Sequence, residues 1–143
     1  MLILALDPGE HSGWCLMDQA GNPHRMGTAK GAELYAVLEK EKDVIDTIVC
    51  ESYRVFSHKL NAHAQSDLKT SRMIGAVEHF SSTHKIKLVM QPPTIKKAGY
   101  GWLRITPPSK HSESHVYDAF AHGFYYCVRQ GTAKIKTAKD VGK

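Results

Sequence analysis

The order of secondary-structure signals along the chain predicts an α/β fold, in which a mixed five-stranded sheet is flanked by helices. Three short segments with strand character come first, and two further strands then alternate with helices. A last helix follows a long segment rich in proline and glycine. The 143 residues suffice for one domain with a substantial core, and no internal repeat or linker divides them.

The first three strands are expected at residues 2–7, 13–18 and 24–29. A tight turn over residues 7–9, Asp-Pro-Gly, joins the first two strands. Proline keeps the preceding aspartate extended, and glycine permits a sharp reversal behind it. Residues 21–23, Gly-Asn-Pro, supply the turn before the third strand. The N-terminal third of the chain is therefore predicted to be a β-meander.

Helices and strands alternate in the middle of the chain. Residues 31–42 contain strong helix formers with one apolar face, and residues 46–51 form the fourth strand. A longer helix is expected over residues 62–82. Residues 85–90 alternate between charged and apolar side chains and form the fifth strand.

The C-terminal third is expected to contain one long loop and one helix. Residues 91–112 hold four prolines and two glycines, which favours a loop. A helix is expected over residues 113–129. We expect residues 1–131 to form the folded domain and residues 132–143 to be a mobile, lysine-rich tail.

Positive charge is concentrated in the second half of the chain. Residues 1–84 carry eight Lys and Arg against eleven Asp and Glu, a balance of −3, and residues 85–143 carry eleven against three, a balance of +8. Six basic residues and no acid lie between Lys85 and His111. A solvated lysine face is one reading of this pattern. Beside acidic groups that bind metal, a polyanionic partner explains it better.

Composition argues against several other classes of protein. The N-terminal apolar segment has no basic residue before it and reaches Asp7 within seven residues, so a signal peptide is not expected. No apolar stretch approaches the roughly 20 residues that span a bilayer, and no membrane partner is expected. The three cysteines lack C-x-x-C spacing. They indicate buried thiols in a reducing, cytoplasmic compartment rather than disulfides or zinc ligands.

Three acidic residues lie next to predicted rigid elements. Asp7 and Glu51 each end an apolar strand, and Asp118 lies on the last predicted helix. Taken singly, each of the first two is equally consistent with an ordinary strand end or turn. Adjacent strands would bring Asp7 and Glu51 together, so that both can converge on Asp118. Three convergent carboxylates predict a site for divalent metal ions.

The last helix places two histidines beside its aspartate. His115, Asp118 and His122 fall within a sector of about 60°, and the apolar side chains lie largely on the other side. This stripe suits a site-forming helix. In a chain with nine histidines, however, His115 and His122 taken singly are better explained as solvated surface residues. The helix dipole favours an anion at Asp118, which is near the N-terminus of the helix.

The acidic residues suit two-metal hydrolysis of a phosphodiester. Two divalent ions about 4 Å apart could be bridged by Asp7, with Glu51 and Asp118 completing the ligand set. One ion would activate water and the other would stabilise the leaving 3′-oxygen. Oxygen ligands favour Mg²⁺, with Mn²⁺ as a substitute, and zinc is not expected.

Several short motifs lie in order along the chain. They are Leu-Ala-Leu-Asp-Pro-Gly followed by Gly-Trp at 4–14, Ile-Val-Cys-Glu at 48–51, Ser-Asp-Leu-Lys leading to a glycine at 66–75, Ile-Lys-Lys before Gly-Tyr-Gly at 95–101, and His-x-x-Asp-Ala-Phe-Ala-His at 115–122. Together these motifs resemble the RuvC-type Holliday junction resolvases of the RNase H-like superfamily, and the resemblance covers about residues 2–128.

The resemblance implies a metal-dependent endodeoxyribonuclease that cleaves Holliday junctions or other branched DNA, such as flaps, in recombination and repair. The family's catalytic, metal-binding acids fall on Asp7, Glu51 and Asp118, and a fourth position falls on His115. Either Lys96 or Lys97 corresponds to the lysine at the scissile phosphate, and Lys96 is the catalytic candidate. The expected DNA-binding residues are Tyr53, Phe56, Lys96, Lys97, Arg104 and Lys110.

The sequence departs from the family after Gly101. The family has a further lysine-bearing helix there, whereas residues 102–113 of this chain contain two prolines. A second catalytic lysine is therefore replaced, by Arg104 or Lys110, or is missing. This shortening resembles bacteriophage members of the family.

Three other functions are alternatives to junction cleavage. A nuclease of the same fold could process RNA instead of DNA. An actin-like ATPase also places Asp-x-Gly after its first strand, but it needs two lobes that 143 residues do not supply. A DNA-binding module without catalytic activity would not need three convergent acids.

We expect a homodimer, because symmetric cuts in a junction call for two active sites related by a two-fold axis. The helix predicted over residues 62–82 has two apolar surfaces, of which one can pack on the sheet and the other on a partner. Alternatively, both surfaces are buried within the monomer. The smaller surface comprises Ala64, Leu68 and Gly75, and the larger one Met73, Val77 and Phe80.

Overall fold

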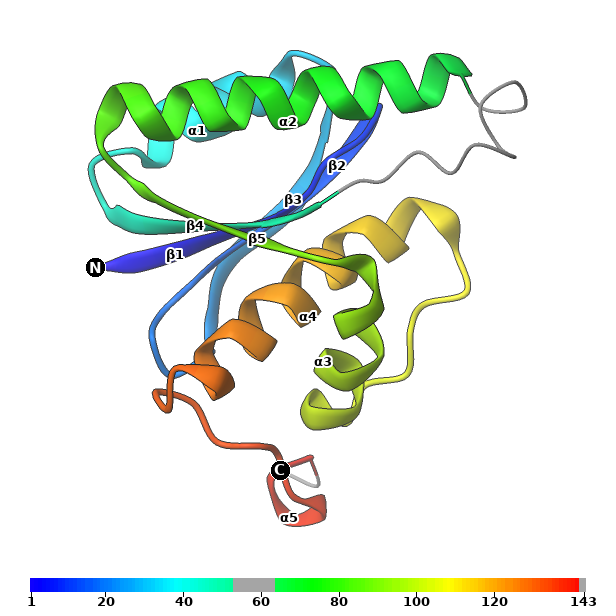
Figure 1. Ribbon diagram of the computed structural model, residues 1–143. Coiled ribbons are helices and arrows are strands. Elements are labelled where there is room, and N and C mark those ends of the chain that lie inside the picture. The colour runs from blue at the N-terminus through cyan, green and yellow to red at the C-terminus, as the bar shows by residue number, and fades with distance from the viewer. Residues whose placement is uncertain (53–63, 142–143) are drawn as a thin grey trace.

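A mixed five-stranded sheet forms the middle layer of the computed structural model, which describes residues 1–52 and 64–141 (Figure 1). The strand order is β3-β2-β1-β4-β5. The β1–β2 and β2–β3 pairs are antiparallel, whereas β1–β4 and β4–β5 are parallel. The predicted fold class, a mixed five-stranded sheet flanked by helices, is confirmed.

The strands lie close to their predicted positions, and every boundary is within two residues of expectation. The meander comprises β1 (Leu2–Asp7), β2 (His11–Met17) and β3 (Pro23–Lys30). The two strands that pair in parallel are β4 (Ile45–Glu51) and β5 (Lys87–Gln91). The turn after Asp7 is short, so β2 begins two residues earlier than predicted.

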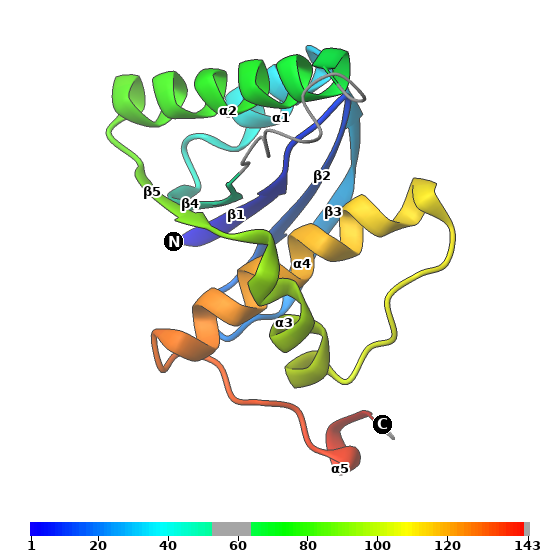
Figure 2. The ribbon, with the colours of Figure 1, turned by 45° about the vertical axis from the view of Figure 1, so that its right-hand side comes forward.

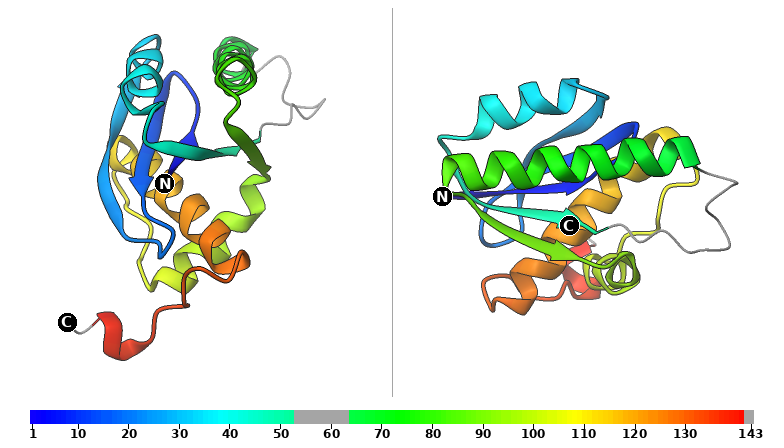
Figure 3. Two further views of the ribbon diagram at one scale, coloured as in Figure 1. Left: turned by 90° about the vertical axis from the view of Figure 1, so that its left-hand side faces the viewer. Right: turned by 45° about the horizontal axis from the view of Figure 1, so that its top comes forward.

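Helices cover both faces of the sheet (Figures 2 and 3). On one face lie α1 (Glu33–Glu41) and α2 (Ala64–His84), and on the other lie α3 (Lys96–Leu103) and α4 (His111–Arg129). A short α5 (Ala138–Val141) follows near the C-terminus. Within the described residues, no helix is long and apolar enough to cross a membrane.

Successive side chains of β1 point alternately to the two helical layers. Leu4 and Leu6 pack in the core under α1 and α2, whereas Ile3 and Ala5 pack in the core under α3 and α4. This burial on both faces explains why the strand is a continuous apolar run. By the same alternation Asp7, only 6% exposed, lies on the side of α4.

Helix α3 forms where the sequence predicted a loop, so that expectation was wrong. Pro92 and Pro93 stand before the helix, where proline costs no hydrogen bond, and a 3₁₀ turn (Pro93–Ile95) leads into α3. Gly99 allows α3 to lie against α4, because a Cβ atom there would be 2.5 Å from the carbonyl oxygen of Ala121. This tertiary contact offsets the weak helix propensity of glycine.

The segment after residue 131 begins packed against the domain. Ala133 belongs to the core under α3 and α4, and the backbone N–H of Lys136 donates to the carbonyl of Trp102 at 2.8 Å. The boundary predicted at residue 131 and the mobility of the tail stay predictions.

Candidate active site

Two strands carry the first two acids to one edge and one face of the sheet. In the parallel register Leu6 pairs with Cys50, so Asp7 and Glu51 follow at equivalent positions on β1 and β4. Their side chains are only 9% and 14% exposed. Asp118 comes from α4, which crosses this face of the sheet. The three acids that the sequence analysis selected therefore converge.

Lys96 lies between two of these acids. It is the first residue of α3, and its Nζ is 3.2 Å from Glu51 Oε2 and 3.3 Å from Asp118 Oδ2. Burial alone would lower the pKa of Lys96, but the negative charges of Glu51 and Asp118 raise it above its usual value. Lys96 therefore stays protonated and holds the two carboxylates together.

Asp7 is paired with His115, at a distance of 2.9 Å between Asp7 Oδ2 and His115 Nδ1. Burial raises the pKa of Asp7 to about 6, although the hydrogen bond to His115 opposes this effect. The same bond raises the pKa of His115. Two of the four residues that the sequence analysis assigned to the ligand set, Asp7 and His115, are thus in direct contact.

His122 is fully buried and connects the cluster to β5. Its Nε2 is 2.9 Å from Glu51 Oε2, and its Nδ1 is 2.8 Å from Gln91 Oε1. Burial would raise the pKa of Glu51, but the hydrogen bond to His122 and the charge of Lys96 hold it below its usual value. The interpretation that the sequence favoured for His122 taken singly, a solvated surface histidine, is therefore wrong.

Tyr100 holds the third acid and was missed by the sequence analysis. Its hydroxyl donates to Asp118 Oδ1 at 2.6 Å. Burial and the adjacent Asp118 carboxylate both raise the pKa of Tyr100, so it remains a donor. A prediction of helix over residues 96–103 would have indicated Tyr100 as a site residue, because residues four apart, such as Lys96 and Tyr100, share one helical face.

Gly13 determines how closely α4 approaches the sheet. It pairs with Asp7 in the antiparallel register of β1 and β2. A Cβ atom at Gly13 would overlap the backbone of His115 and Val116. The missing side chain thus lets α4 rest directly on β2, next to Asp7.

The other predicted site residues are more dispersed. Lys97 lines a cavity beside the cluster, and Arg104 donates from Nε to the carbonyl oxygen of Lys136. Lys110 is the N-cap residue of α4. Among the residues that the structure describes, neither Arg104 nor Lys110 bonds to an acid of the cluster. Tyr53 and Phe56 lie outside the described residues.

The donor atoms of the cluster suit a hard divalent cation. Carboxylate oxygens from three acids are the ligands that Mg²⁺ and Mn²⁺ prefer. Across residues 1–52 and 64–141, however, no three Asp, Glu, His or Cys side chains are arranged to hold an ion as they stand. The ammonium group of Lys96 takes contacts from Glu51 and Asp118 instead. The oxygen atoms of these residues are thus of the kind that binds the metal. Some of them, on Glu51 and Asp118, are engaged by Lys96.

Comparisons with solved structures identify the fold, whereas no protein-family model and no curated protein matches the sequence. RuvC of Thermus thermophilus in complex with a Holliday junction substrate aligns with a TM-score of 0.65 at 16% identity, covering 94% of this chain and 99% of that chain. A further T. thermophilus RuvC structure aligns with a TM-score of 0.62 at 16% identity and the same coverage.

A viral protein has the same architecture. The resolvase of fowlpox virus, in complex with substrate Holliday junction DNA, aligns with a TM-score of 0.59 at 13% identity, covering 91% of this chain and 99% of that chain. The resemblance inferred from the sequence motifs is thus confirmed at the level of structure. The chain has the RNase H-like α/β fold of the RuvC-type resolvases.

Proposed function

We propose that this protein is a metal-dependent endodeoxyribonuclease that cleaves Holliday junctions or other branched DNA. The observation that carries the proposal is the convergence of Asp7, Glu51 and Asp118 at one edge of an RNase H-like sheet, with Lys96 between Glu51 and Asp118. Two structures of similar fold are complexes with Holliday junction DNA, which supports branched DNA as the substrate.

The acids and His115 would hold Mg²⁺ or Mn²⁺, and the bound metal supplies activation of water and stabilisation of the leaving oxygen. Lys96 can exchange a carboxylate oxygen for an oxygen of the scissile phosphate, because both are anionic acceptors. That exchange would free Glu51 and Asp118 as ligands. His122 and Tyr100 keep these two carboxylates oriented, so little reorganisation is needed during the reaction.

A panel of labelled substrates tests the proposal against its alternatives. Purified protein with Mg²⁺ is offered a four-way junction, a flap, plain duplex DNA and an RNA–DNA hybrid. We expect cleavage of the branched DNA at a rate well above that of duplex. Preferential cleavage of the hybrid would favour the RNA-processing alternative, and tight junction binding without any cleavage would favour a non-catalytic DNA-binding module.

The two adjacent lysines should have separable effects. Lys97→Ala is expected to weaken junction binding and reduce the salt slope of log K by about one, because one phosphate contact is lost. Lys96→Ala should instead reduce cleavage more than binding, since Lys96 lies within the acid cluster. Filter binding at several salt concentrations measures the slopes. An unchanged slope for Lys97→Ala would assign this lysine to a solvated face.

His122 is proposed as a positioning residue for Glu51. His122→Ala should weaken both Mn²⁺ binding and cleavage by about 10- to 100-fold, which is typical when a partner of a metal ligand is removed. His122→Gln should recover part of both, because its amide can donate from a place similar to that of Nε2. Calorimetric Mn²⁺ titration and thermal melts separate the roles. A lower melting temperature with unchanged Mn²⁺ affinity would make His122 purely structural.

A homodimer is proposed, with α2 at the interface. Met73, Val77 and Phe80 are buried against the sheet, whereas Leu68 is 57% exposed and a side chain at Gly75 would meet open space. The larger apolar surface thus packs within the monomer, and part of the smaller one is left outside.

Light scattering tests this arrangement. The wild type should have twice the 15.9 kDa mass of one chain. Leu68→Glu should give a monomer, because a buried unpaired charge is costly at an interface. Val141→Glu, at a similarly exposed apolar residue on α5, is the control and should stay dimeric. A wild-type monomer at micromolar concentration, with and without junction DNA, would refute the dimer.

A reducing, cytoplasmic compartment is proposed for the protein. Cys15, Cys50 and Cys127 are buried free thiols. Burial raises the pKa of Cys127 to about 11, so its reactive thiolate is scarce at neutral pH. None of the three is paired in a disulfide.

A further inference from the structure

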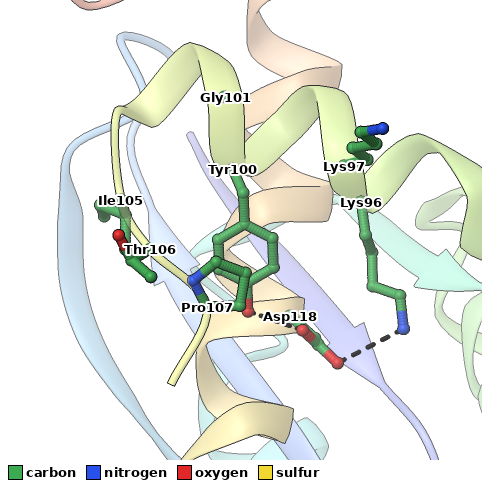
Figure 4. Close-up of a pocket in the computed structure, with 8 residues that line it drawn as sticks. All are labelled: Lys96, Lys97, Tyr100, Gly101, Ile105, Thr106, Pro107 and Asp118. Carbon is green, nitrogen blue, oxygen red and sulfur yellow. Dashed lines mark hydrogen bonds and ion pairs between the residues drawn. The ribbon is translucent and has the colours of Figure 1, made fainter. Parts of the chain in front are cut away.

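A cavity of about 520 Å³ opens directly beside the acid cluster (Figure 4). Lys96 and Asp118 belong both to the cluster and to the lining of this cavity. Figure 4 shows Lys96 pointing to Asp118, whereas Lys97 on the next position of α3 points away from it. The cavity is therefore continuous with the place where the scissile phosphate is proposed to bind.

The lining combines apolar surface with positive charge. Ile105 and Pro107 come from the segment after α3, and Tyr100 lines the same cavity together with Lys96. Ligand sites for small organic groups are commonly about 300–1,000 Å³ and mostly apolar, with a few polar groups that fix orientation. A nucleotide matches this lining, because its base is flat and apolar on its faces while its phosphate is anionic.

Gly101 forms an open part of the cavity lining. It lies inside α3 and lines the cavity, yet a Cβ atom there would meet no atom within 4 Å. Glycine inside a helix costs about 0.5–1 kcal/mol relative to alanine. Gly99 has a packing reason for this cost, namely its contact with Ala121, whereas Gly101 has no such contact. Glycine at this position therefore leaves this part of the cavity open.

We propose that the cavity receives the nucleotide adjacent to the scissile phosphate, with its base against Ile105 and Pro107. A strand whose phosphate reaches Lys96 can continue past Asp118 into the cavity, which begins there. The proposal rests on the proposed nuclease function and adds to it a binding site for one flanking nucleotide.

Abasic substrates test this site in the wild-type protein. After the cut has been mapped, four-way junctions are prepared that lack the base immediately 5′ of the cut, immediately 3′ of it, or at a distant position in the same strand. Loss of one flanking base should slow cleavage about tenfold, because the apolar contact of that base with Ile105 and Pro107 is lost. Loss of the distant base should have no effect. Unchanged rates for both flanking positions would overturn the proposal.

Filling the cavity provides the matching protein variant. Gly101→Gln should cleave the intact junction about tenfold more slowly and should be insensitive to loss of the flanking base. Gly101→Ala should raise the melting temperature as much as Gly75→Ala, a control at an equally open helical glycine on α2. Wild-type cleavage by Gly101→Gln would contradict the proposal, and if this variant fails to fold, the abasic series decides alone.

The outcomes for the cavity and for the nuclease function are distinguishable. If wild-type protein cleaves none of the DNA substrates, the proposed function fails and no cut can be mapped. If it cleaves the junction but tolerates the missing flanking bases, only the nucleotide site fails. Binding is followed separately with 2-aminopurine beside the mapped cut and Ca²⁺ in place of Mg²⁺, where wild type should change the fluorescence and Gly101→Gln should not.

Discussion

Asp118→Asn is expected to reduce junction cleavage by about a thousandfold while leaving junction binding intact or tighter. The substitution keeps the shape of the side chain but removes the charge that Lys96 and a metal ion require. A loss of about 4 kcal/mol of transition-state stabilisation corresponds to this factor. Binding should survive, because contacts from Lys and Arg to phosphates supply most of the affinity. Asp7→Asn and Glu51→Gln should behave in the same way.

Single-turnover cleavage and filter binding, both with Mg²⁺, measure the two effects. Glu113→Gln is the matched control, because this exposed acid lies in the first turn of the same helix but outside the cluster. It should cleave at the wild-type rate. Full activity in Asp7→Asn would refute the proposed metal site.

Gly13→Ala should have the largest effect on the fold itself. The added methyl group would overlap the backbone of His115 and Val116, so α4 has to move away from β2. Overpacking typically costs about 1–3 kcal/mol and sometimes more, and here the obstacle is backbone rather than a flexible side chain. The folded variant should also cleave the junction about 100-fold more slowly than the wild type, because His115 and Asp118 move with α4 relative to Asp7.

Urea unfolding and cleavage assays test this coupling between fold and site. Gly9→Ala is the control in the neighbouring turn, where a Cβ atom would make only ordinary contacts, the nearest at 3.5 Å. It should change the free energy of unfolding by less than about 1 kcal/mol. A Gly13→Ala protein with wild-type stability and activity would show that α4 can occupy a different position without loss of the site.

The sheet and the acids could be predicted because local patterns specify them. A continuous apolar run such as Ile3–Leu6 indicates a strand buried on both faces, and an acid at the end of such a strand emerges at the sheet edge. If the two strands are adjacent and parallel, Asp7 and Glu51 lie next to each other. The proposed roles of these acids, by contrast, rest on chemistry that the fold by itself does not test.

Helix α3 and its contacts could not be predicted from local patterns. Glycines at 99 and 101 and the nearby prolines argue for a loop, and the packing of α3 against α4, including Gly99 on Ala121 and the buried Leu103, reverses that preference. The same limitation hid Tyr100, whose bond to Asp118 depends on α3. The sequence placed His122 on the same helical face as His115 and Asp118. Its contacts with Gln91 and Glu51 could not be predicted, because these two residues come from two different strands.

Metal-dependent cleavage of a strand-labelled four-way junction tests the central claim most directly. Each of the four strands is labelled in turn, and the junction is incubated with protein in Mg²⁺, in Mn²⁺ or in EDTA. We predict nicks at symmetrically opposed positions in two strands with either metal and no product in EDTA. Absence of product with both metals, or equal cleavage in EDTA, would contradict a metal-dependent junction nuclease built on Asp7, Glu51 and Asp118.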